Sequence, residues 1–156
     1  MLFLVSAPNV GAALVPQVLE APRTGSLIMT PALALKLENS SEDYVLLQVW
    51  TPACALCAQQ FEELNTTFDL AAEKGKSLLV LGVPVQGTEV EYLTFLERHR
   101  PSFDQWVADD EFLKNLQVVS QGDKNPYLLL LDRSRHVVKR WRGVVGHKEI
   151  LGAIKG

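Results

Sequence analysis

Short apolar runs alternate with amphipathic stretches along most of the chain. Three runs are rich in strand-favouring residues and too short for typical helices, so they predict buried strands: they cover Tyr44–Trp50, residues 77–83 and Tyr127–Leu131. After the first run, the stretch AQQFEELNTTFDLAAEKG places Phe61, Leu64 and Phe68 at helical spacing and ends near Gly75, where a C-terminal cap belongs. This pattern predicts a helix directly behind the first strand.

Weaker patterns complete the series of elements. Further strands are predicted at residues 26–29, 103–108 and 136–142, the last joined to the strand before it by a turn at residues 132–135. Further helices are predicted at residues 30–39, with Thr30 as cap and Pro31 as first helical residue, and at residues 88–100, 109–116 and 147–154. Strands that alternate with helices and end in a hairpin and a helix predict an α/β domain with a central mixed sheet flanked by helices.

The first 25 residues differ from the rest. They are mostly apolar, carry no Lys or Arg before Arg23 and are interrupted by three prolines, so they fit poorly as a complete signal peptide. Two interpretations stay open: residues 1–25 are the trailing part of a trimmed signal or anchor, or they are an arm lying on the domain of residues 26–156. No apolar run approaches the roughly 20 residues that a membrane-spanning helix needs, so no span is expected.

Size and charge narrow the class of protein. A chain of 156 residues is long enough to bury a hydrophobic core as one domain without disulfide staples. Its net charge is −3, and its 15 Lys and Arg residues are scattered rather than clustered. Nucleic acids and anionic membranes bind basic faces, so neither is an expected partner.

The only two cysteines, Cys54 and Cys57, stand between the first predicted strand and the helix that follows it. If that helix begins at or just before Cys54, this sulfur lies beside unpaired backbone N–H groups and the positive end of the helix dipole, which favour the thiolate. Cys57 follows about one helical turn later, close enough to attack a mixed disulfide formed at Cys54. The spacing therefore indicates a redox pair with Cys54 as the nucleophile.

Two other uses of the cysteines are disfavoured. A zinc site ordinarily needs four ligands, and the chain has no second C-x-x-C motif and no pair of histidines, because His99, His136 and His147 are widely separated. A purely structural disulfide would close only a very short loop and would restrain the unfolded chain little. No metal and no cofactor are expected.

Asn125 and Pro126 stand directly before the apolar run Tyr127–Leu131. An X-Pro bond at the mouth of a buried strand is a candidate for the cis form. The alternative is a trans proline that simply ends the preceding loop.

Taken together, these segments resemble the thioredoxin superfamily, and more narrowly the TlpA and ResA-like bacterial thiol-disulfide oxidoreductases. The resemblance covers about residues 26–156 and rests on the order VLLQVW, TPACALC, FEEL, LLVLGV and NPYLLLLDRSRHVVKRWRG, followed by a final helix. It implies a thioredoxin-like fold in which Cys54 is the attacking thiol and Cys57 the resolving thiol.

The same resemblance implies a substrate-binding region. Pro126 would be a cis proline that faces the disulfide, and the backbone beside it would pair with an extended substrate segment. Asn125 would tune substrate contact and redox behaviour, and Trp50 would belong to the active-site surround.

Five residues depart from the usual pattern of these families. Ala53 replaces the bulky residue often found before the first cysteine, and Ala55 and Leu56 stand where a proline often separates the cysteines. Gln48 and Gln60 replace the acidic residues of thioredoxin-type and ResA-like proteins, respectively. Since Gln cannot ionise, the resolving thiol would pass its proton to water or to another base.

The expected function is thiol-disulfide exchange on protein cysteines, with a thiol protein as redox partner. Reduction of the substrate is the expected direction. The bacterial periplasm or cell envelope is the expected location, with the cytosol as the alternative. One rival is a peroxiredoxin-like peroxidase, because Thr51 stands three residues before Cys54, although Leu47 replaces the proline of that family. The other is a non-enzymatic thioredoxin-like module that binds an extended partner or carries Cu(I) between the thiolates.

Overall fold

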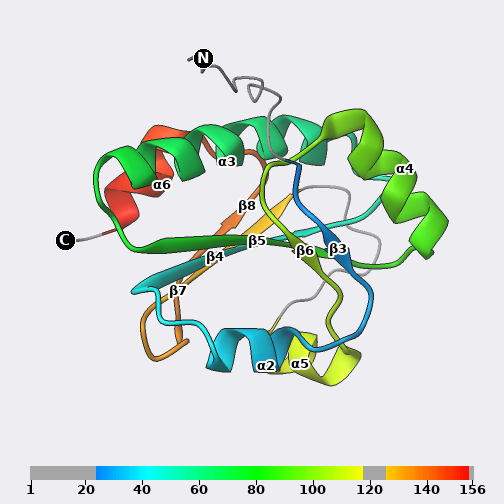
Figure 1. Ribbon diagram of the computed structural model, residues 1–156, viewed down its shortest axis with the longest axis horizontal. Coiled ribbons are helices and arrows are strands. Elements are labelled where there is room, and N and C mark those ends of the chain that lie inside the picture. Colours follow the sequence, from blue (N-terminus) through cyan, green and yellow to red (C-terminus); the bar gives the residue numbers. More distant parts are fainter. Residues whose placement is uncertain (1–23, 118–125, 155–156) are drawn as a thin grey trace, which may run out of the picture.

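The computed structural model describes residues 24–117 and 126–154, which form one mixed sheet with helices on both faces (Figure 1). The strands are β3 (Leu27–Ile28), β4 (Tyr44–Trp50), β5 (Leu78–Pro84), β6 (Gln105–Trp106), β7 (Tyr127–Leu131) and β8 (Val137–Arg142). The helices are α2 (Leu33–Glu38), α3 (Ala55–Glu73), α4 (Glu89–His99), α5 (Asp110–Asn115) and α6 (His147–Ala153).

The sheet has six strands in the order β3-β6-β5-β4-β7-β8. Strands β3, β6, β5 and β4 run parallel to one another, whereas β7 is antiparallel to β4 and β8 is antiparallel to β7. The predicted α/β class with a central mixed sheet flanked by helices is therefore confirmed.

Helices cover the two faces of the sheet unequally. Figure 1 shows α3, α4 and α6 on one face and α2 and α5 on the other. Along β4, Leu46 and Trp50 pack into the core beneath α3, whereas Val45, Leu47 and Val49 pack into the core on the α2 side. Both faces of β4 are buried, which explains why its residues are apolar with the exception of Gln48.

The predicted elements agree best with the structure where the sequence pattern is strongest. Strands β4 and β7 have the predicted bounds, and helix α4 begins after Thr88, whose side chain forms a capping box with Glu91. Gly75, which was expected to end α3, has a left-handed φ of 67° just beyond the helix.

Several predicted elements were too long, among them the strand expected at residues 26–29, which is reduced to β3. The strand expected at residues 103–108 is reduced to β6, in which Gln105 pairs with β3 and β5 and Trp106 pairs with β3. The helix expected from Thr30 begins at Leu33 instead, after an N-cap at Ala32 that has no side-chain capping bond. Residues 1–23 lie outside the described ranges, so both interpretations of the N-terminal segment stay predictions.

No helix in the described part of the chain is both long and apolar enough to cross a membrane.

Candidate active site

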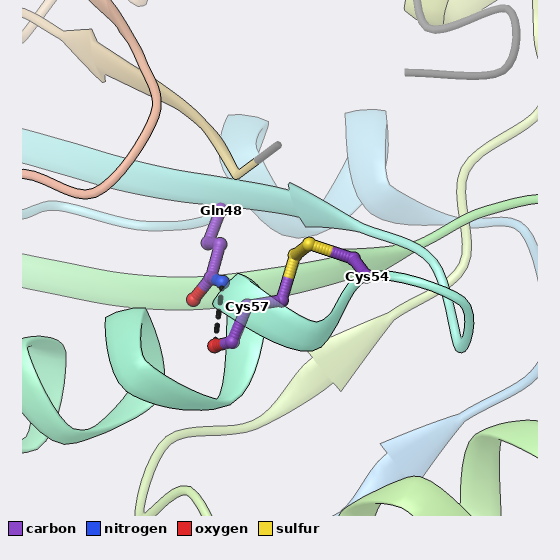
Figure 2. Close-up of a disulfide and its surroundings, with 3 residues drawn as sticks. All are labelled: Gln48, Cys54 and Cys57. Atoms are coloured by element: carbon purple, nitrogen blue, oxygen red, sulfur yellow. Dashed lines mark hydrogen bonds between the residues drawn. A yellow bond between two sulfur atoms is a disulfide. The ribbon is translucent and has the colours of Figure 1, made fainter. Parts of the chain in front are cut away.

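The two cysteines lie at the start of α3, just beyond the end of β4 (Figure 2). Cys54 is the N-cap residue of α3, and its backbone N–H donates to the Thr51 carbonyl at 3.1 Å, which closes a tight turn between strand and helix. Cys57 lies in the first helical turn. The two residues form a disulfide with an S–S distance of 2.08 Å and a Cα–Cα distance of 5.3 Å.

The first turn of α3, which holds the pair, carries no acidic residue. Cys54 and Cys57 are both buried. A helix of 19 residues presents unpaired N–H groups and a positive dipole end at its N-terminus. No acidic side chain in that turn offsets this charge, and the role of Cys54 as the attacking thiolate stays a prediction.

Gln48 lies beneath the cysteine helix, on the face of β4 that points toward α3. Its side chain is fully buried, and Nε2 donates to the Cys57 carbonyl at 3.3 Å (Figure 2). Its Oε1 atom is buried without a hydrogen-bond partner. The side chain therefore contacts the backbone of Cys57, the predicted resolving cysteine, through a neutral donor.

Gln60 is the second buried amide near the pair, three residues after Cys57. Its Nε2 donates to the Val145 carbonyl at 2.9 Å, and its Oε1 accepts from the Val145 backbone N–H at 2.8 Å. The side chain thus joins α3 to the segment between β8 and α6.

Glu63 continues this contact along α3. One of its carboxylate oxygens accepts from the backbone N–H of His147 at 2.8 Å and lies 2.9 Å from Nδ1 of the same residue. The side-chain hydrogen bond from His147, and then the backbone one, hold the pKa of Glu63 below its usual value.

Trp50 lies in the core behind the cysteine helix. Its ring is stacked on Phe95 at 4.8 Å and contacts Phe61 and Tyr92 edge-on at 5.4 and 5.8 Å between centroids. Only 1% of the residue is exposed. The structure therefore places Trp50 as packing for the active-site surround, and a direct substrate contact by its ring stays a prediction.

The indole of Trp50 is held by a residue that sequence reasoning missed. Nε1 donates to Oε1 of Gln105, a fully buried side chain on β6, at 2.8 Å. The Gln105 amide occupies the space above Gly82 on β5, because a Cβ atom at Gly82 would lie 1.8 Å from that oxygen. The sequence did contain one indication of this contact, the single glycine inside the apolar run SLLVLGV. A glycine within a strand is typical of a position where another group packs closely against the backbone.

Pro126 lies at the same end of the sheet as the cysteines. The antiparallel register pairs Tyr127 with Val49, so the buried Pro126 comes level with Trp50, the last residue of β4. Its carbonyl accepts from the Gly143 N–H at 2.8 Å. Asn125, and with it the peptide bond to Pro126, lies outside the described residues, so the cis bond and the role of Asn125 stay predictions.

Among residues 24–117 and 126–154, no group of three or more His, Cys, Asp and Glu side chains could hold a metal ion. Two of the histidines contact neighbours: the His99 ring lies tilted against Phe95, with 4.5 Å between centroids, and His147 bonds to Glu63. The groups that the site presents for chemistry are the two sulfurs of Cys54 and Cys57.

No protein-family model and no curated protein sequence matches the chain. Solved structures do match. The thioredoxin domain of the thiol-disulfide oxidoreductase BVU-2223 from Bacteroides vulgatus is 21% identical to this chain. The match covers 74% of this chain and 81% of the other, with a TM-score of 0.60. The exposed lipoprotein thioredoxin Etrx1 from Streptococcus pneumoniae has 22% identity, with coverages of 76% and 87% and a TM-score of 0.58.

A secreted disulfide oxidoreductase from Mycobacterium tuberculosis is similar at 16% identity, with coverages of 72% and 80% and a TM-score of 0.55. At these identities the likeness concerns the arrangement of the backbone. The mixed sheet, its two helix layers and these likenesses together show that the described part of the chain has the thioredoxin fold.

Proposed function

We propose that this protein is a thiol-disulfide oxidoreductase that acts on the cysteines of other proteins. The observation that carries the proposal is the disulfide between Cys54 and Cys57 at the N-terminus of α3, within a thioredoxin fold. A pair in this position combines a sulfur stabilised as thiolate with a second sulfur one turn away. Both properties are what exchange chemistry needs.

Reduction of a substrate disulfide would take two exchange steps. The Cys54 thiolate attacks one substrate sulfur, the substrate S–S bond breaks, and the other sulfur leaves as a thiolate that takes up a proton. The Cys57 thiol then loses its proton and attacks Sγ of Cys54, which breaks the mixed disulfide and releases the second substrate sulfur. Two electrons pass to the substrate, and a thiol partner protein restores the dithiol by the reverse steps.

We further propose that the protein acts as a reductant in the periplasm or cell envelope of a bacterium. The resemblance to TlpA and ResA-like proteins supports reduction, since these relatives are commonly reductants. The similarity to a secreted oxidoreductase and to an exposed lipoprotein supports a location outside the cytosol. Residues around Pro126, with Asn125, would line the edge that meets an extended substrate.

Single cysteine variants test the reaction. Cys54→Ser should abolish insulin reduction, because the attacking sulfur is lost, whereas Cys57→Ser should accumulate mixed disulfides that it cannot resolve. Full activity of Cys54→Ser would contradict the proposal. Rapid peroxide consumption by Cys57→Ser would instead indicate a peroxidase, and a tight stoichiometric Cu(I) complex with negligible exchange would indicate a carrier.

The reduction potential of the Cys54–Cys57 couple tests the direction. We expect a value near that of thioredoxin, about −270 mV, at equilibrium with glutathione of known redox ratio. A value near about −120 mV would make the protein an oxidant and would overturn the proposed direction while leaving the reaction class intact.

A further inference from the structure

The Gln60 side chain makes a paired contact that neither a carboxylate nor an apolar residue could reproduce. It is fully buried in α3, and its amide bonds both backbone groups of Val145, at 2.9 and 2.8 Å. A primary amide carries one donor group and one acceptor oxygen, which match the C=O and N–H of a single residue as a neighbouring strand would. Without Gln60, both buried backbone groups of Val145 would lose these partners.

The segment held by Gln60 leads directly to Pro126. Gly143, two residues before Val145, donates its N–H to the Pro126 carbonyl at 2.8 Å. Its φ of 91° is a left-handed conformation that suits glycine, and here the chain leaves β8. Consecutive hydrogen bonds therefore link Gln60 to segment 143–145, and this segment to the start of β7.

A glutamate at position 60 would break this link. Its ionised form offers no donor to the Val145 carbonyl and would place a negative oxygen against that carbonyl. Burial raises the pKa of a carboxyl group, however, and a protonated glutamic acid again has one donor and one acceptor. The contact would then depend on pH, which the natural amide avoids.

We propose that Gln60 is a positioning residue for protein substrates: by fixing segment 143–146 against α3, it holds the Pro126 edge of β7 beside the cysteine pair. This inference rests on the proposed function, since it assigns that edge to an extended substrate. A small disulfide does not need the edge, because it reaches the sulfur without pairing to the backbone. Gln60 should thus affect protein substrates selectively.

The test compares Gln60→Glu with Gln59→Glu, which makes the same substitution at the exposed neighbouring position of α3. Each variant and the wild type reduce two substrates, insulin and hydroxyethyl disulfide. At about pH 8 we expect kcat/KM for insulin to fall about tenfold in Gln60→Glu, a loss typical of one buried polar group left unpaired. The rate with hydroxyethyl disulfide should change less than about twofold, and Gln59→Glu should match the wild type with both substrates.

Lowering the pH provides the rescue. As the introduced carboxyl group protonates, insulin reduction by Gln60→Glu should return toward the wild-type value measured at the same pH. The comparison at equal pH is needed because other groups on the contacting elements titrate or carry charge in every variant; these are Cys57, Glu63, Arg142, His147 and Glu149.

Several outcomes would overturn the proposal. Insulin reduction equal to wild type throughout the pH range would show that the contact does not position substrate. A parallel fall with both substrates would indicate general damage, and faster exchange with both at high pH would indicate proton transfer at position 60. If the wild type reduced neither substrate, the proposed function itself would fail.

A second variant covers the case in which Gln60→Glu does not fold at the higher pH. Gln60→Asn keeps both amide groups but is shorter by one methylene, so it cannot reach Val145 in the same way. We expect the same selective loss with insulin, without recovery at low pH. Unchanged selectivity in this variant would refute the positioning role.

Discussion

At the scale of single residues, two buried glutamines, Gln48 and Gln60, contact the backbone of Cys57 and of Val145, respectively. Gln48 donates to the Cys57 carbonyl, and Gln60 bonds Val145. Both side chains are fully buried, where an ionised group would be costly. Proton transfer from Cys57 therefore has no carboxylate at either position.

Gln48→Glu should make stability depend on pH. Burial raises the pKa of the new carboxyl above its unfolded value of about 4.3, so the folded state binds the proton more tightly. The free energy of unfolding therefore falls as pH rises above that value, by an expected 2 to 3 kcal/mol, roughly, between about pH 5 and pH 8. Urea unfolding of the oxidised protein measures this loss.

The control for this prediction is Gln59→Glu, whose carboxyl would be exposed. Its unfolding free energy should follow that of the wild type at both pH values. If the unfolding free energy of Gln48→Glu were equally independent of pH, water would have to reach the introduced carboxyl group, and the prediction would be wrong.

Glu63 should contribute stability that acid removes. Because its folded pKa lies below the usual value of 4.5, its contribution is fully present above that pH and is lost as pH falls through the folded pKa. The pair with His147 is partly exposed, with about 31% and 32% of the side chains accessible, so solvent screening keeps the expected effect below about 1 kcal/mol.

Glu63→Gln tests this contribution by thermal unfolding between about pH 3 and pH 7. The variant should be less stable than the wild type near neutral pH and equal to it at the acid end. Glu62→Gln, at the exposed neighbouring position, should show no such convergence. A constant difference between Glu63→Gln and the wild type would rule out the ionised carboxylate as the cause.

At the scale of elements, β6 packs against β5 through the side chain of Gln105, which lies directly over Gly82. Gln105 lies over Gly82 and bonds the indole of Trp50, which packs against α3 and α4 through Phe61 and Phe95. Strands β4, β5 and β6 and helices α3 and α4 therefore meet at one buried cluster around the Trp50 indole.

Gly82→Ala should disturb this contact. The new Cβ would lie 1.8 Å from Oε1 of Gln105, so the amide must move and release Trp50. We expect a loss of about 1 to 3 kcal/mol in unfolding free energy and a change in the near-ultraviolet circular dichroism of the tryptophan.

Gly152→Ala in α6 is the matched control, because a Cβ there meets no atom within 4 Å. A helical Gly→Ala change at an open position should stabilise by up to about 1 kcal/mol. In a Gln105→Ala background, Gly82→Ala should lower the unfolding free energy less than it does in the wild type, because the clashing amide is gone. Simple additivity of the two changes would contradict the proposed clash.

At the scale of the whole molecule, the end of the sheet opposite the cysteines is held by Arg135. Its guanidinium donates to the carbonyls of Leu37, Ser40 and Glu42, at 3.4, 2.8 and 2.9 Å, and thereby ties the β7–β8 turn to the loop between α2 and β4. These segments are far apart in the chain, so the contact is a long-range one that depends on the packed fold.

Arg135→Lys should lower the unfolding free energy by about 1 to 3 kcal/mol, because an ammonium group cannot reach several carbonyls in a fixed fork. Arg133→Lys is the control: Arg133 pairs with Asp43 at the surface, where ion pairs contribute less than about 1 kcal/mol. Exchange with a small disulfide should be unchanged in both, since the site lies at the other end of β4. A loss of that activity in folded Arg135→Lys would contradict the separation of the two ends.

Some features of this protein were determined by the sequence alone. The bounds of β4 and β7, the start of α4 at Thr88 and the position of the cysteines at the start of a helix all follow from local patterns. Apolar runs, helical spacing and capping residues act over a few neighbouring positions, so the sequence is enough to predict them.

Other features were decided only by the tertiary structure. Strands were predicted near β3 and β6, but their short lengths are set by where they pair with each other and with β5. The partner of the Trp50 indole N–H is Gln105, which lies 55 positions away. From the sequence, Gln60 was notable only because it replaces an acidic residue. Its hydrogen-bond partner Val145 lies 85 positions further along the chain. Hydrogen bonds over such separations depend on how the elements pack, and no local pattern encodes them.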